Sequence, residues 1–167
     1  MHVRHAVESD LDAMVDLLEE VAAERIHIGT EMPVDRSERR ERFARSLREG
    51  HINLVAEQDD AVVGILGLKE FGGLFDLGMM IRAQWRGKGA GRALLTAAIE
   101  AATRAGGHKI TLQVWPHNHA AIALYESAGF EREGYQRGHW KRREGEIWDV
   151  ILMGLRLGEP AGDEPRS

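Results

Sequence analysis

Three glycines at alternate positions stand in the segment Arg86-Gly87-Lys88-Gly89-Ala90-Gly91, directly before a stretch with helical spacing. The first N–H groups of a helix have no partners inside it and carry the positive end of the helix dipole. Glycines leave the backbone bare, so that a phosphate can reach those N–H groups. Arg82, Lys88 and Arg92 add positive charge beside Arg86. The segment therefore predicts a loop that binds a pyrophosphate; a glycine-rich turn that only caps the helix is the alternative.

The common nucleotide-binding motifs do not fit this segment. A Walker A loop needs Ser or Thr after its Gly-Lys pair, where this chain has Gly89, and a dinucleotide fingerprint needs a glycine in place of Arg92. The remaining pattern, Arg86-x-x-Gly89-x-Gly91, resembles the Q/R-x-x-G-x-G/A signature of the GNAT superfamily of N-acetyltransferases. In that family the loop holds the pyrophosphate of acetyl-coenzyme A. The resemblance implies that acetyl-CoA is bound by Arg86, Gly87, Lys88, Gly89, Ala90, Gly91 and Arg92.

A second segment, Asn118 to Phe130, resembles the GNAT pattern N-x-x-A-x-x-L-Y-x-x-x-G-F at each of its fixed positions. Taken alone, Asn118 is a good helix N-cap and Tyr125 is a core tyrosine with its hydroxyl at the surface. In the family the asparagine contacts the pantetheine arm and the tyrosine hydroxyl lies near the thioester sulfur. The resemblance therefore implies that both residues bind the cofactor. A phenol with a pKa of about 10 can donate a hydrogen bond or a proton to the leaving thiolate.

The apolar run from Leu74 to Ile81 precedes the glycine-rich loop and predicts a strand. The resemblance implies that backbone groups of Met79, Met80 and Ile81 pair with pantetheine as if it were an added strand. It also implies that the strand at 109–115 splays away to admit the cofactor. Plain core packing is the alternative for the two methionines, and both roles are compatible.

The acceptor amine must lose a proton before it attacks, so a general base is needed. Some GNAT members that acetylate protein N-termini carry a glutamate on the strand before the Asn helix, where this chain has Gln113, which cannot act as a base. The segments 29–33 and 143–150 resemble those of the phosphinothricin acetyltransferase branch and the related amino-acid N-acetyltransferases. That resemblance places Glu31 at the border of the acceptor site, as first candidate for the base or the amine binder. An exposed loop carboxylate is the alternative.

The acceptor pocket is expected between the loop at 26–36 and the hairpin at 137–146. Its apolar walls would be tryptophans, and arginines of the hairpin would bind a substrate carboxylate unless they are simply solvated. Further candidates are two histidines as proton shuttles and an aspartate that needs a partner if it is buried. These residues are Trp115, Trp140, Trp148, Arg137, Arg142, Arg143, His117, His139 and Asp149.

The composition excludes several other classes of function. The chain has 167 residues and a net charge of −5, which disfavours nonspecific binding to nucleic acid. No apolar run approaches the roughly 20 residues that span a bilayer. There is no cysteine, which excludes thiolate nucleophiles and Cys-based metal sites and suits the cytoplasm. We therefore expect a cytoplasmic protein that binds no metal, no nucleic acid and no membrane.

The hydrophobic periodicity and the turn residues place these motifs on a definite order of elements. Helices are predicted at 10–24 (with Ser9 as N-cap), 37–49, 92–105 and 119–128, and strands at 2–7, 52–57, 62–69, 74–81, 109–115, 130–140 and 147–156. This order, βααβββαβαββ, is also that of the GNAT fold. We expect an α/β protein with one GNAT domain at 1–157, a mixed, mostly antiparallel twisted sheet of about seven strands, four helices, and a disordered tail at 158–167.

The resemblance implies an acetyl-CoA-dependent N-acetyltransferase. It would move the acetyl group by direct transfer to the primary amine of a small molecule, an amino acid or an analogue, and could form a homodimer as relatives in this branch do. A protein or peptide N-terminal or lysine acetyltransferase is the alternative within the family. A non-catalytic acyl-CoA-binding regulatory module is the alternative from another class, and the intact Asn118 and Tyr125 argue against it.

Overall fold

The computed structural model describes residues 1–158, in which seven strands form a single sheet. The strand order is β1-β2-β3-β4-β5-β7-β6, and among these strands the pair β4–β5 is parallel while all others are antiparallel. The prediction of a mixed, mostly antiparallel sheet of seven strands is confirmed. The strands are β1 His2–His5, β2 Ile52–Gln58, β3 Ala61–Phe71, β4 Leu74–Ile81, β5 Lys109–Val114, β6 Glu131–Lys141 and β7 Ile147–Arg156.

Within residues 1–158, four α-helices accompany the sheet, as predicted: α1 Leu11–Ala23, α2 Arg36–Arg48, α3 Ala90–Arg104 and α4 His119–Ser127. The prediction of Ser9 as the N-cap of α1 is wrong. Ser9 lies within a short 3-10 turn, Glu8–Asp10, and the Asp10 carboxylate accepts the Val7 N–H at 2.8 Å. That turn comes before α1 because Asp10 is also held by Arg4, at 2.7 Å.

Two other helices begin earlier than predicted because of their caps. Asp35 caps α2, its carboxylate accepting the Glu38 N–H at 2.9 Å, so the helix begins at Arg36 rather than Ser37. Gly89 adopts the left-handed conformation, with φ at 89°, as N-cap of α3, so this helix begins at Ala90 rather than Arg92. The predicted disordered tail lies outside the described residues apart from Gly158, and the predicted domain extent of 1–157 stays a prediction.

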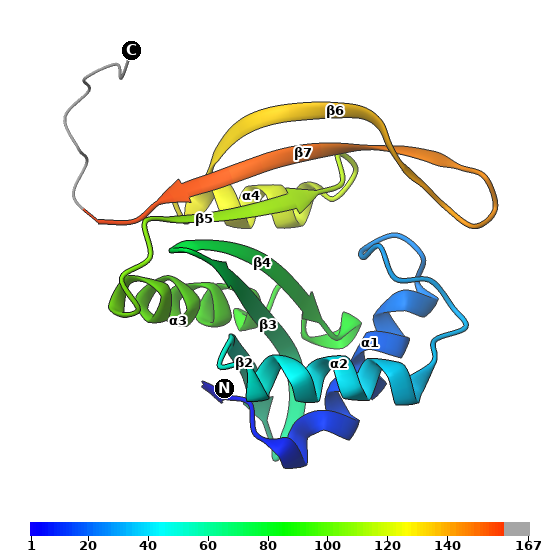
Figure 1. Ribbon diagram of the computed structural model, residues 1–167. Helices are drawn as coiled ribbons and strands as arrows, with labels where there is room; N and C mark the ends of the chain where they lie inside the picture. Colours follow the sequence, from blue (N-terminus) through cyan, green and yellow to red (C-terminus); the bar gives the residue numbers. More distant parts are fainter. Residues whose placement is uncertain (159–167) are drawn as a thin grey trace.

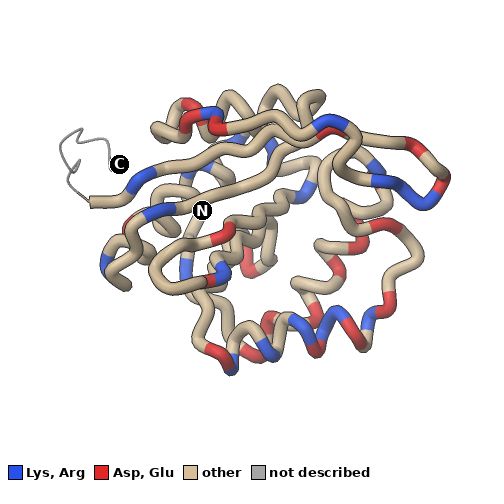
Figure 2. The backbone as a smooth tube through the Cα atoms, turned by 45° about the horizontal axis from the view of Figure 1, so that its top comes forward, with Lys and Arg blue, Asp and Glu red and all other residues tan. Residues whose placement is uncertain are grey.

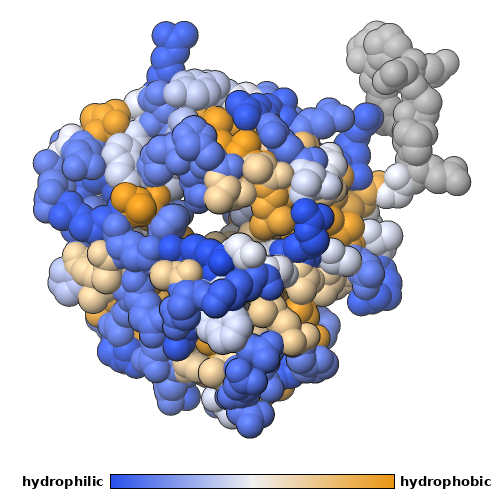
Figure 3. Space-filling view, turned by 180° about the vertical axis from the view of Figure 1, so that it is seen from behind, coloured by the Kyte–Doolittle hydropathy of each residue, from blue (hydrophilic) through white to orange (hydrophobic). Residues whose placement is uncertain are grey.

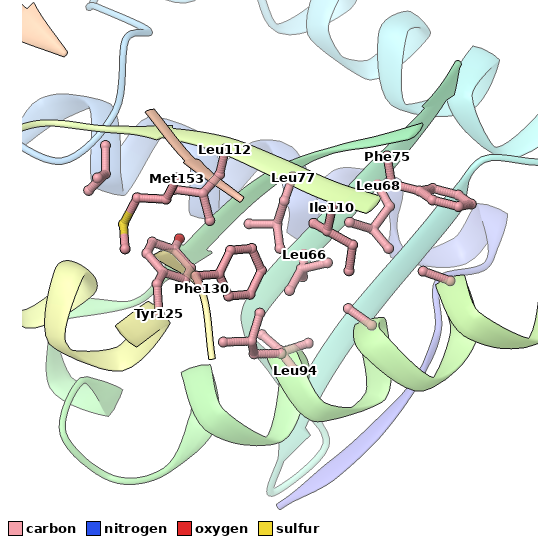
Figure 4. Packing of buried hydrophobic residues seen from close by; sticks show 14 of the residues in the cluster. Leu66, Leu68, Phe75, Leu77, Leu94, Ile110, Leu112, Tyr125, Phe130 and Met153 are labelled. Atoms are coloured by element: carbon pink, nitrogen blue, oxygen red, sulfur yellow. The ribbon is translucent and has the colours of Figure 1, made fainter. Parts of the chain in front are cut away.

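The helices cover opposite faces of the sheet (Figure 1). Buried side chains of α1 and α2 pack on one face of the first strands, against Val55 and Ile65. The helices α3 and α4 pack on the other face, where Leu94 belongs to the same buried cluster as Leu66 and Leu77 (Figure 4). The alternating apolar positions of β3 supply both faces, which is why this strand reads as a nearly continuous hydrophobic run.

The feature that creates the site is the separation of β4 from β5. The two strands pair only where Leu74–Asp76 meets Lys109–Thr111, although β4 continues to Ile81 and β5 to Val114. Beyond this point β5 remains in the sheet through its antiparallel pairing with β7. Figure 1 shows β5, β7 and β6 rising away from β4, β3 and β2. Beyond Asp76, the edge of β4 that faces β5 has no strand partner and borders an opening in the middle of the sheet.

Candidate active site

A cavity of about 1060 Å³ occupies the opening between β4 and β5. Figure 3 shows the molecule hollowed near the middle of one face, with hydrophilic and hydrophobic residues around the opening. Because side chains alternate along a strand, β4 sends Leu77 and Met79 toward α3 and α4, and Asp76, Gly78 and Met80 toward α1 and α2. The cavity is lined by Val21, residues 27–30, Arg39, Arg42, residues 76–81, Arg86, Gly87, Gly89, Gly91, Arg92, residues 113–115, Asn118, Ala120, Ala121, Leu124, Tyr125 and Trp140.

The glycines of the loop before α3 serve two different purposes. Gly87 and Gly89 have φ angles of 70° and 89°, and a Cβ at either position would meet nothing within 4 Å. They are therefore needed for backbone conformation and leave open space above the loop. A Cβ on Gly91 would lie 2.9 Å from Leu124 Cδ2, so this glycine allows α3 to pack against α4. The first N–H groups of α3 have no partner inside the helix, and Gly89 and Gly91 at this helix start line the cavity.

The arginine that opens this loop is engaged by the protein itself. Its guanidinium donates to both oxygens of Glu24 at 2.6 Å, to the carbonyl of Ile81 at 3.0 Å, and lies 3.0 Å from His27 Nε2. Arg86 holds the pKa of Glu24 below its usual range through these hydrogen bonds. Arg86 borders the cavity, but its charge is largely balanced, and its clearest role is to fix the loop against the end of α1.

The other predicted cofactor residues of the loop divide in two groups. Arg92 lines the cavity and donates to the Ser127 hydroxyl at 3.2 Å. Lys88 and Ala90 do not line it: Lys88 Nζ lies 5.1 Å from the ring centroid of Trp85, and Ala90 is buried. The structure thus brings Gly87, Gly89, Gly91 and Arg92 together with Met79, Met80 and Ile81 around one space.

Asn118 and Tyr125 both border the cavity from α4. The Asn118 side-chain oxygen accepts the Ala121 N–H at 3.3 Å, which confirms the N-cap and leaves its NH₂ group for a ligand. Tyr125 is 6% exposed and packs beside Phe130 (Figure 4). Burial raises the pKa of Tyr125 above its ordinary value of 10.0. The hydroxyl makes no hydrogen bond with any residue of the described chain, so it is free to serve a ligand.

Glu31 is not among the residues that line the cavity, although it directly follows Thr30, which is. Its carboxylate accepts the Arg143 N–H, at 3.0 Å for Oε2, and lies 3.6 Å from Arg142 Nε. These contacts join the loop between α1 and α2 to the β6–β7 hairpin. The assignment of Glu31 as the base stays a prediction.

The expectation that Arg142 presents its charge to a substrate is wrong, whereas that for the exposed Arg143 stays a prediction. Arg142 is 4% exposed, donates to the carbonyls of Arg25, Ile28 and Gly29, and stacks 4.3 Å over the ring of Trp148. Arg143 donates to the carbonyl of Met32 at 2.6 Å. Both arginines donate to carbonyl groups of the irregular loop at 25–32, which the loop cannot pair by itself.

Two of the three predicted aromatic walls border the cavity. Trp115 and Trp140 line it, in an edge-to-face pair with ring centroids 5.8 Å apart. Trp148 lies behind Trp115, at 5.1 Å, and supports it. The cavity therefore borders both the loop and the hairpin, with Gly29 packed on Trp140, and its role as the acceptor pocket stays a prediction.

The remaining sequence candidates hold the hairpin and the loop in place. The Asp149 carboxylate accepts hydrogen bonds from the Tyr135 hydroxyl at 2.6 Å and from the Gly138 N–H at 2.7 Å. These bonds hold the pKa of Asp149 below its usual range. His117 Nε2 lies 2.8 Å from the carbonyl of Ile26. Asp149, His117 and His139 are not among the residues that line the cavity.

Sequence reasoning missed four charged or titratable residues of the cavity: Asp76, His27, Arg39 and Arg42. Asp76 stands at the point where β4 and β5 separate, and burial raises its pKa while Lys69 lowers it. The pKa of His27 is lowered by burial and by Arg86. One signal was present in the sequence, because Asp76 is the only charged residue in the run Leu74–Ile81.

Residues 14–130 match the model of the acetyltransferase (GNAT) family. The chain belongs to this family. An L-methionine sulfoximine/L-methionine sulfone acetyltransferase of Pseudomonas paraeruginosa is 30% identical over 98% of both chains. The resemblance inferred from the two motifs and the prediction of an acetyltransferase are thereby confirmed.

Solved structures agree with this assignment. A phosphinothricin acetyltransferase from Sinorhizobium meliloti in complex with AcCoA aligns with a TM-score of 0.86 at 25% identity, over 99% of this chain and 93% of that one. A ribosomal-protein-alanine N-acetyltransferase from Brucella melitensis aligns with a TM-score of 0.87 at 29% identity, over 94% and 100%. In residues 1–158 of this acetyltransferase, no helix is long and apolar enough to cross a membrane, and no cluster of three potential metal ligands occurs.

Proposed function

We propose that this acetyltransferase moves the acetyl group of acetyl-CoA directly to the primary amine of a small molecule, an amino acid or an analogue. The observation that carries the proposal is the continuity of one cavity from the α3 loop to Trp115 and Trp140. Donor and acceptor can meet in it without a covalent enzyme intermediate. The chain has no cysteine to form an acyl-cysteine, which also favours direct transfer.

The donor would occupy the side of the cavity next to α3 and α4. Backbone N–H groups at Gly89, Ala90 and Gly91, with Arg92, would take the pyrophosphate. The β5-facing edge of β4 at Met79 and Met80 and the NH₂ group of Asn118 would hold the pantetheine arm. A strand edge left unpaired inside a sheet supplies the regular donors and acceptors that an extended amide-containing chain requires.

In the reaction the amine nitrogen attacks the thioester carbon, a C–N bond forms, the C–S bond breaks with its electrons on sulfur, and the nitrogen loses its remaining extra proton to solvent to give the amide. The ammonium must first give up a proton. Asp76 is the carboxylate that lines the cavity, and its raised pKa makes it a better proton acceptor than an ordinary aspartate. We assign this role to Asp76 in preference to Glu31, whose contacts with Arg142 and Arg143 suit a positioning role.

The departing thiolate is stabilised by Tyr125. A thiol has a pKa of about 8.5, well below that of a buried phenol, so full proton transfer from the tyrosine is unfavourable. The phenol stays protonated and donates a hydrogen bond to the sulfur as negative charge develops there. Solvent can supply the proton after release.

The decisive test is release of CoA from acetyl-CoA, followed with a thiol reagent, against amino acids, polyamines, aminoglycosides and short peptides. The enzyme has no thiol and adds no background. We expect release with free amino acids or their analogues. Release with peptides alone would favour a protein acetyltransferase, and binding of acetyl-CoA without release would favour a regulatory module. A cytoplasmic location and a homodimer stay predictions.

A further inference from the structure

Two arginines of α2, Arg39 and Arg42, line the cavity one helical turn apart, opposite the side next to α3 and α4 that the donor is proposed to occupy. Their side chains are 27% and 57% exposed. Neither guanidinium makes a hydrogen bond with a residue of the described chain. Each lies 3.5 Å from an oxygen of the same carboxylate, Glu38, which is longer than the 2.7–2.9 Å typical of a charge-assisted hydrogen bond.

Other arginines of the same helix are paired more closely. Arg36 contacts Asp16 at 2.7 Å, Arg40 contacts Asp12 at 2.9 Å, and Arg48 contacts Glu41 at 2.6 Å. Figure 2 shows basic and acidic residues alternating along α2. Arg39 and Arg42 differ from these arginines because they line the cavity and share one carboxylate, Glu38, at a longer distance.

The surrounding groups do not balance these two charges. Asp76, the carboxylate that lines the cavity, pairs across the sheet with Lys69, which is the cation that acts on its pKa. Burial and Arg86 lower the pKa of His27, which disfavours its charged form. The acceptor side therefore presents an excess of positive charge, as two planar forks that fit carboxylate oxygens in pairs.

We propose that Arg39 and Arg42 form an anion-binding subsite that selects acceptors carrying a carboxylate or a similar oxyanion beside the reacting amine. The inference rests on the proposed function and narrows it. The ammonium group of the acceptor lies toward Asp76, its anion lies toward α2, and its apolar part lies against Trp115 and Trp140. Amines without an anionic group bind weakly because nothing balances the two guanidinium groups.

The test uses pairs of acceptors that differ by one charge. L-Glutamate and L-glutamine differ in the side chain, and L-methionine and L-methioninamide differ at the α-carboxyl group. For each pair, kcat/KM is measured for the native enzyme and for the double variant Arg39→Gln/Arg42→Gln. For each acceptor, kcat/KM of the variant is divided by that of the native enzyme. Because both values refer to the same amine, its basicity cancels. We expect the native enzyme to favour the anionic member of at least one pair, and the variant to lose roughly 10- to 100-fold on that member alone.

Two further variants separate the subsite from a general effect of charge or folding. Arg48→Gln removes one positive charge from the same helix outside the cavity. We expect it to leave the preference in kcat/KM for the charged over the neutral member of each acceptor pair unchanged. Glu38→Gln removes the competing carboxylate, and we expect a KM for the anionic acceptor that is lower by a few-fold. A gain in affinity cannot come from misfolding.

Binding can also be followed without turnover, because Trp115 and Trp140 line the cavity and their fluorescence should respond to an acceptor. The pair that responds to Arg39→Gln/Arg42→Gln tells which carboxylate is bound. Equal use and equal binding of charged and neutral members by the native enzyme, or an unchanged ratio in the double variant, overturns the subsite. If the enzyme still acetylates neutral amines, the proposed function stands and only the subsite is refuted. The proposed function itself fails if no amine causes release of CoA.

Discussion

Replacement of Asp76 by asparagine should lower activity and raise stability in the same protein. Asparagine keeps the shape and the place where β4 and β5 separate but cannot accept the proton of the ammonium. Loss of a general base typically slows a reaction 10²- to 10⁴-fold, about 3–5 kcal/mol of transition-state stabilisation. We expect a fall of that size in kcat at saturating acetyl-CoA, with a smaller change in the KM of the amine.

The stability change follows from the pKa of this carboxyl group. Burial raises the pKa of Asp76 in the folded protein, so the ionised form is less favourable there than in the unfolded chain. The folded protein binds the proton of this carboxyl group more tightly than the unfolded chain does. The resulting stabilisation of the folded state is present at low pH and is lost as pH rises through the raised pKa. Near pH 7 the native protein carries the penalty and Asp76→Asn does not, although Lys69 and partial exposure reduce the difference.

The assay combines steady-state kinetics with thermal unfolding across a pH series. The Tm of Asp76→Asn should exceed that of the native protein near pH 7, and the two should converge as pH falls below about 4. Glu31→Gln is the matched control, and it should keep the chemical step while weakening the contact with Arg143. Native kcat in Asp76→Asn, or a larger loss of kcat in Glu31→Gln, would refute the assignment of the base.

Three other substitutions test separate parts of the site. Tyr125→Phe removes a cavity-facing hydroxyl that has no partner in the described chain, so kcat should fall about 10- to 100-fold, while the Tm stays nearly unchanged; an unchanged kcat would remove Tyr125 from the reaction. Gly89→Ala forces a side chain into a φ of 89° at the start of α3. It should cost about 1–2 kcal/mol of stability and weaken acetyl-CoA binding in calorimetry, whereas native affinity would show that the loop conformation is not required. Arg142→Met leaves three loop carbonyls without a donor, at roughly 1–3 kcal/mol each. Thermal unfolding should show a clear loss of stability with a weaker acceptor KM, and a native Tm would contradict the proposed role in holding the loop.

The elements and the two family motifs could be read from the sequence because each depends on neighbours along the chain. Glycines at 87 and 89 give the positive φ angles that precede α3, and Asn118 caps α4 through a residue three positions away. The alternation of apolar residues fixed the strands, and the order of elements fixed the fold. Errors at helix starts, such as Ser9, came from a competing cap nearby.

The use of each charged group was decided by the tertiary structure alone. Arg86 is taken up by Glu24, which lies 62 residues earlier, and Arg142 by carbonyls more than 110 residues earlier. Asp76 reaches the cavity only because β5 leaves β4 at that residue, and Arg39 and Arg42 only because α2 folds over the opening. The type of a residue and its spacing in the sequence indicate which chemical roles its side chain is capable of. Whether its charge is balanced or offered to a substrate depends on distant segments that burial brings together, and no local pattern records them.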